Sequence, residues 1–192
     1  MRPAMKIVSF LPLCTLLLAA TPAPAEEVVR VALFDSIELE GGGHVIVKSG
    51  DVQTVRLVQG SPAYTHFTVS GGRKLRIEAC NRDCPHHYDL EVEITTPRVN
   101  GLAISGGGAI ESAGNFAPEH HVALAVDGGG KIDVRSMDAD DAEAAVNGGG
   151  EIRLKAHGNL TAAIDGGGEI RYWGNPHVTQ AIDGGGEIRR GD

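Results

Sequence analysis

Hydrophobic and polar residues alternate along most of the chain after about residue 28. Leu124 and Val126, for example, share their parity with Ile132 and Val134 further along. A period of two is typical of β-strands that bury one face, whereas a helix repeats every 3.6 residues. No convincing amphipathic helix pattern interrupts these runs. The alternation therefore predicts an all-β fold.

Triplets of glycine punctuate this alternation. They hold 18 of the 27 glycines, and the last five triplets are separated by 22, 20, 18 and 18 residues. The six triplets begin at Gly41, Gly106, Gly128, Gly148, Gly166 and Gly184. A repeat of about this length is typical of solenoids, in which each unit buries its apolar face against its neighbours.

From this repeat we predict a parallel β-helix, a solenoid with Gly-Gly-Gly turns every 18–22 residues, from about residue 28 to residue 190. Gly71-Gly72-Arg73 is interpreted as a degenerate triplet of the same kind. An antiparallel β-sandwich in the N-terminal half, joined to a C-terminal solenoid, is the alternative architecture.

The N-terminus has the features of a secretory signal peptide. Arg2 and Lys6 give a positive start before the apolar stretch Ile7 to Ala20, and Ala23-Pro24-Ala25 offers small residues to a signal peptidase. The apolar stretch is too short to span a bilayer comfortably, and no later one approaches the length of a membrane span. We predict a signal peptide over residues 1–25 and a single β-helix domain over residues 26–192. The expected location is extracytoplasmic, in the periplasm, on the cell surface or secreted.

Two cysteines, Cys80 and Cys84, remain after the predicted cleavage. In an oxidising compartment we expect them to form a disulfide that closes a small loop. The alternative is a zinc site that includes His86 and His87. Four ligands so close in sequence cannot easily surround one ion, which favours the disulfide.

Composition limits the classes of partner. The formal net charge is −8, the isoelectric point is about 5.4 and aromatic residues make up only 4% of the chain. Nucleic-acid binders concentrate Lys and Arg, so we expect no nucleic-acid partner. We expect no membrane span.

Several short motifs occur in a characteristic order along the chain. They are Phe34-Asp35-Ser36-Ile37, Gly43-His44-Val45-Ile46-Val47, Gly50-Asp51, Lys74-Leu75-Arg76-Ile77, Ile94-Thr95-Thr96-Pro97 and Ser105-Gly106-Gly107-Gly108. Together they resemble the bacterial family of unknown function named "putative autotransporter adhesin, head GIN domain". The resemblance implies a right-handed β-helix that is secreted or located in the envelope. It implies no catalytic residues, and adhesion is the family's label.

A column of polar residues directly precedes the later triplets. Its members are Asp127, Asn147, Asp165 and Asp183. If neighbouring turns stack, these side chains lie about 5 Å apart, where like charges repel unless they share a cation such as calcium. The alternative is that Asp and Asn cap backbone amides at the turn. We predict neither a metal ion nor another cofactor, and keep these four residues as the candidate metal ligands.

Two further outward columns carry opposite charges. One contains Lys131, Glu151, Glu169 and Glu187, and the other contains Asp133, Arg153, Arg171 and Arg189. We predict ion pairs between neighbouring strands here. A shared turn edge could also bring together His121, His157 and His177, either as ordinary surface residues or as a metal site.

These features favour a non-enzymatic, secreted or envelope-located protein with an adhesin-like or structural role. The expected ligand is an envelope component, a glycan or another protein. A carbohydrate-active β-helix enzyme and a calcium-binding repeat module are the alternatives. Because the last repeat stops at Arg190-Gly191-Asp192 without an obvious cap, we also expect either homo-oligomerisation through an open C-terminal end or a very short cap there.

Overall fold

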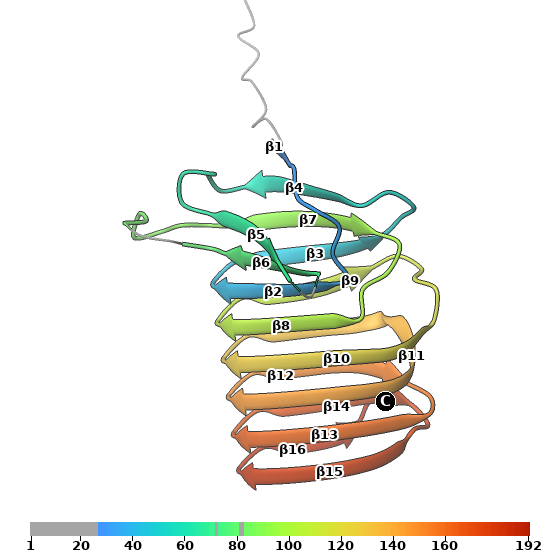
Figure 1. Ribbon diagram of the computed structural model, residues 1–192. Helices are drawn as coiled ribbons and strands as arrows, with labels where there is room; N and C mark the ends of the chain where they lie inside the picture. The colour runs from blue at the N-terminus through green and yellow to red at the C-terminus, as the bar shows by residue number, and fades with distance from the viewer. Residues whose placement is uncertain (1–26, 72, 81–82) are drawn as a thin grey trace, which may run out of the picture.

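The computed structural model describes residues 27–71, 73–80 and 83–192, which form one mixed sheet of sixteen β-strands (Figure 1). The predicted signal peptide lies outside the described residues. No helix in the described part of the chain is long and apolar enough to cross a membrane. The strands are β1 (Glu27–Val29), β2 (Ser36–Gly41), β3 (His44–Ser49), β4 (Thr54–Gln59), β5 (His66–Ser70), β6 (Lys74–Glu78), β7 (Glu91–Thr96), β8 (Gly101–Gly106), β9 (Ala109–Ala113), β10 (Glu119–Gly128), β11 (Lys131–Gly148), β12 (Glu151–Ala156), β13 (Asn159–Gly166), β14 (Glu169–Gly174), β15 (His177–Gly184) and β16 (Glu187–Arg190).

Most strands lie in two rows that face each other across the core. The first, which we call the small-residue row, contains β2, β8, β10, the second half of β11, β13 and β15 as parallel neighbours. The second, which we call the charged row, contains β3, β9, the first half of β11, β12, β14 and β16, also in parallel. Strand β11 belongs to both rows, so the sheet bends back on itself and nearly closes in a barrel-like shape (Figure 1).

The N-terminal end of the sheet contains antiparallel pairs. Strand β4 pairs antiparallel with both β1 and β7, and β5 pairs antiparallel with β6. The backbone N–H of Arg73 donates to the carbonyl oxygen of Ser70 at 3.0 Å in the turn that joins β5 to β6. A short hairpin turn of this kind connects antiparallel strands, because parallel strands need a longer crossover.

The prediction of one right-handed parallel β-helix with glycine turns over residues 28–190 is therefore wrong. The all-β class holds, but the strands form a nearly closed mixed sheet with parallel and antiparallel pairs. Gly71 and Arg73 belong to the hairpin between β5 and β6 rather than to a degenerate triplet turn. The physical reason is that side-chain alternation is the same in both kinds of strand, so it does not report strand direction.

The core lies between the two rows and is one continuous apolar cluster. Its centre consists of isoleucines in register across the charged row, among them Ile110, Ile132 and Ile152, and none of these has measurable exposure. Burial alternates strictly along strands such as β12 and β13. The period of two thus determines which side chains of each strand point into the core and which point outward. Strand register aligns the outward side chains of neighbouring strands into columns on the surface.

Candidate functional site

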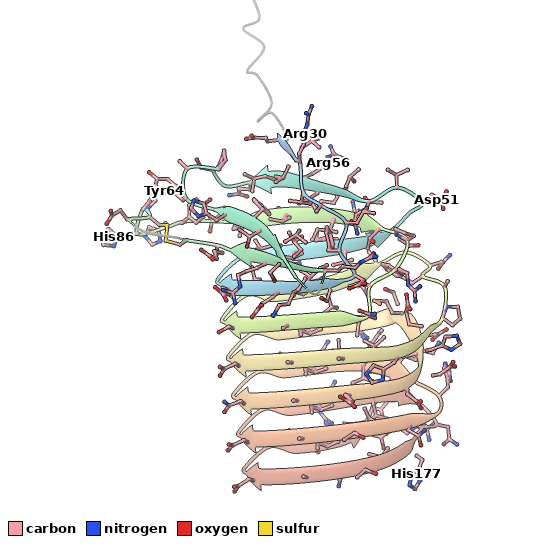
Figure 2. All side chains as sticks on the ribbon, viewed as in Figure 1. Arg30, Asp51, Arg56, Tyr64, His86 and His177 are labelled. Carbon is pink, nitrogen blue, oxygen red and sulfur yellow. A yellow bond between two sulfur atoms is a disulfide. The ribbon has the colours of Figure 1, made fainter. Side chains whose placement is uncertain are left out.

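The outer side of the small-residue row carries a column of alanines. Strand register places one on each of five neighbouring strands, and four of the five are followed two residues later by an acidic or amide side chain. The column contains Ala103, Ala125, Ala145, Ala163 and Ala181. Figure 2 shows that β8, β10, β13 and β15 carry few long side chains on this side. We call this surface the small-residue face.

The polar column predicted from the sequence runs beside the alanines. Asp127 is in register with Ser105 on one side and with Asn147 on the other, and the column continues in register to Asp165 and Asp183. Its four predicted members are exposed. Among the described residues, no ion pair or side-chain hydrogen bond involves Asp127, Asp165 or Asp183, and no group of three or more His, Cys, Asp or Glu forms a candidate metal site. The column is therefore an exposed polar line in which Asp127, Asp165 and Asp183 supply three unpaired carboxylates.

Between these columns lies a shallow trough of about 650 Å³. It extends from β8 to β15 and is lined by the alanine and polar columns, with Glu38 at the β2 end. A second trough, of about 410 Å³, shares four of the alanines and is lined on its other side by Glu143 and Thr161. Small side chains thus leave an elongated depression that crosses the strands.

The outer side of the charged row differs because its charges are paired with one another. The Arg189 guanidinium lies 2.8 Å from a Glu169 carboxylate oxygen on the neighbouring strand, and an Arg153 nitrogen lies 3.8 Å from an Asp133 oxygen. Pairs within one strand add to these, such as Arg171 with Glu169 at 2.6 Å. The predicted ion pairs between neighbouring strands are confirmed. This face presents little unpaired charge to a ligand.

Asp133 is the most enclosed carboxylate of this network, with 13% of its side chain exposed. Burial raises its pKa, but the hydrogen bonds from the Arg135 side chain and backbone outweigh this effect, and the pKa lies below its ordinary value of 3.8. A lowered pKa in the folded state means that the stabilisation is complete above the unfolded-state pKa. It is lost as the pH falls through the folded-state pKa.

We therefore predict that Asp133→Asn weakens the acid dependence of stability. The variant should melt lower than wild type at pH 7, and the difference should shrink as the pH falls below 3.8, because the contribution of the ionised carboxylate is lost as the pH falls through the folded-state pKa. Thermal unfolding over this range of pH measures the change. The same substitution at the exposed Asp127 is the control, and a Tm difference for Asp133→Asn that stays constant with pH would contradict the prediction.

The histidines proposed for a shared turn edge do not meet in one cluster. His121 is in register with Asp141, and His177 with Asn159, so two strands separate the two rings. His157 instead faces Asp138, with 3.4 Å between Nε2 and a carboxylate oxygen. Cys80 and Cys84 form a disulfide in the structure, beside the labelled His86 (Figure 2). The cysteines and histidines thus lie away from the trough.

Sequence reasoning identified the polar column but missed the alanine column. The available signal was an Ala two residues before each Asp or Asn that precedes a triplet, as at Ala125, Ala145, Ala163 and Ala181. A single outward alanine does not predict a binding surface. The surface arises only because strand register places five alanines side by side.

Comparisons with known proteins place this architecture in a family. The family model described as "Putative auto-transporter adhesin, head GIN domain" matches residues 33–122 and 117–176. A "putative adhesin" from Bacteroides fragilis NCTC 9343 is 17% identical, with a TM-score of 0.53, covering 86% of this chain and 96% of its own. At this identity the likeness shows the all-β fold alone.

A second similar structure is a "putative adhesin" from Parabacteroides distasonis ATCC 8503, which is 17% identical. The match covers 87% of this chain and 96% of that one, and its TM-score of 0.40 is too low to carry an argument. No curated protein matches the chain.

Proposed function

This chain belongs to the family described as "Putative auto-transporter adhesin, head GIN domain", and from that premise we propose a non-enzymatic, extracytoplasmic, adhesin-like role. The proposed ligand is an elongated polymer of the cell envelope or of a host surface. It binds in the trough between the alanine and polar columns of the small-residue face.

The observation that carries the proposal is the continuity of the trough across five strands. Parallel neighbours lie about 4.8 Å apart, so the same pair of surface groups recurs at that interval along the trough. A ligand with regularly repeated units can therefore make the same contact on each strand. Alanine methyls allow its backbone to approach closely, and the unpaired carboxylates offer hydrogen-bond acceptors along one side.

The arrangement supports binding better than glycoside hydrolysis. That chemistry requires two carboxyl groups on opposite sides of the scissile bond. In the trough, the acidic residues of the polar column lie in a single line, and the side facing them is formed by alanines. The carboxylate near the β2 end, Glu38, is occupied by an ion pair with Lys74 at 2.7 Å.

Two features support the extracytoplasmic location. The signal-peptide pattern over residues 1–25 predicts export, and a disulfide between Cys80 and Cys84 suits an oxidising compartment. The name of the family, which describes an adhesin domain, agrees with this location.

The test is binding of the exported protein to a native envelope fraction, to a glycan array and to host matrix. Ala145→Arg fills the middle of the trough and should weaken binding by about tenfold or more. Ala109→Arg makes the same change on the charged row and is the matched control, which should bind as wild type does. Failure of the wild type to bind any of the three surfaces, or equal losses in both variants, would contradict the proposal.

A further inference from the structure

Strands β15 and β16 differ from the inner strands of their rows because each has only one neighbour among the described residues. β15 pairs with β13 and β16 with β14, at the bottom of the sheet in Figure 1. The core is also open at this end. Ile182 is 42% exposed, whereas Ile164, its partner on β13, is 3% exposed. This edge therefore presents backbone hydrogen-bonding groups together with apolar side chains.

The sequence of β15 is complementary to itself when two copies run antiparallel about Gln180. On the outer side this alignment places His177 opposite Asp183 of the second copy, and Thr179 opposite Ala181. On the inner side it places Val178 opposite Ile182. Directly opposed residues of an antiparallel pair interact most strongly, so the alignment brings an imidazole next to a carboxylate and joins apolar side chains at the same time.

Gln180 itself occupies a position that is apolar on the preceding strands. Its register partner on β13 is Ala162, which in turn pairs with Ala144 on β11, and both alanines are buried. A polar side chain at an inward position requires a hydrogen-bonding partner when it is covered. In the symmetric alignment, Gln180 meets Gln180 of the second copy, and each amide can both donate and accept.

The opposite end of the sheet offers a poorer edge. β1 has three residues and β5 has five, whereas β15 has eight. Short edge strands are one way in which proteins prevent pairing with other chains. Association of two β15 edges is thus favoured over head-to-tail stacking, and it produces a closed two-fold pair rather than a fibre.

We propose that two copies of this chain associate through antiparallel pairing of their β15 strands, centred on Gln180. The sheet then continues from one copy into the other, and the exposed Ile182 side chains become buried. The small-residue faces of the two copies become neighbours in the dimer. This assembly is independent of the ligand proposed above, because it needs only the strand edge.

Sedimentation equilibrium of the exported protein over a range of concentrations tests the assembly. The wild type should be dimeric, and Asp183→Lys should raise the dimer Kd by about tenfold or more, because it places a lysine opposite His177. Combining Asp183→Lys with His177→Glu places opposite charges across the pair and should recover the dimer. Asp165→Lys, one strand away in the same column, should leave the Kd unchanged.

Thermal unfolding of each variant separates a weakened interface from a damaged fold. A wild type that stays monomeric at all concentrations would overturn the proposal, and Gln180 would then be a polar cap for the end of the core. Failure of the double variant to recover the dimer, or equal weakening by Asp165→Lys, would overturn the proposed register.

Discussion

Replacing Gly148 with alanine should lower the free energy of unfolding by about 2–4 kcal/mol, since backbone strain and overpacking both contribute. Gly148 has a φ of +113°, and a Cβ there would lie 2.7 Å from the carbonyl oxygen of Gly128 on the preceding triplet. Gly150 is also tightly placed, because its Cβ would lie 2.8 Å from the Gly130 oxygen and would overlap the Val126 side chain. Gly150→Ala should therefore cost about 1–3 kcal/mol.

The middle residue of the same triplet provides the control. A Cβ on Gly149 would meet nothing within 4 Å, so Gly149→Ala should change stability by less than about 0.5 kcal/mol. Urea denaturation of the three variants and the wild type measures the differences. Equal losses at all three positions would show that the triplets serve some purpose other than close packing of successive turns.

The second large effect is expected at the centre of the core. Ile132→Ala should lower the free energy of unfolding by about 2–5 kcal/mol, since the side chain has no exposure and packing on both sides hinders collapse of the cavity. Its register partners, Ile110 and Ile152, are equally buried. The truncation therefore interrupts a continuous apolar column.

Leu33→Ala is the matched control, because 69% of Leu33 is exposed and its truncation should cost less than about 0.5 kcal/mol. Both variants can be compared with wild type in the same urea series. A small loss for Ile132→Ala, close to that for Leu33→Ala, would mean that the two rows do not enclose a well-packed core.

The alternation of the sequence was sufficient to predict strands and their buried faces. Leu124, Val126 and Ile132 are buried, as their shared parity requires. The alternation was insufficient to predict strand direction. β2 and β6 pair in parallel, β5 and β6 pair antiparallel, and all three strands show the same alternation. Direction depends on the length and path of the connection, and the hairpin at Ser70–Arg73 is set by local turn geometry.

The candidate site was predictable only in part for a related reason. Charged residues such as Asp165 and Arg171 attract attention in a sequence because each side chain has its own chemistry. The methyl groups of Ala145 and Ala163 have no distinctive chemistry of their own. They line a trough only because strand register aligns them. The spacing between triplets contains that register, but a small outward side chain gives no signal of its own in the sequence.

Hydrogen exchange of the protein with and without an envelope or matrix fraction is the most direct test of the proposed binding surface. We expect protection in peptides covering residues 123–127, 143–147 and 161–165, which cross the trough, and unchanged exchange over residues 151–155 and 169–173 of the charged row. Protection confined to the charged row would contradict the assignment of the small-residue face as the binding surface.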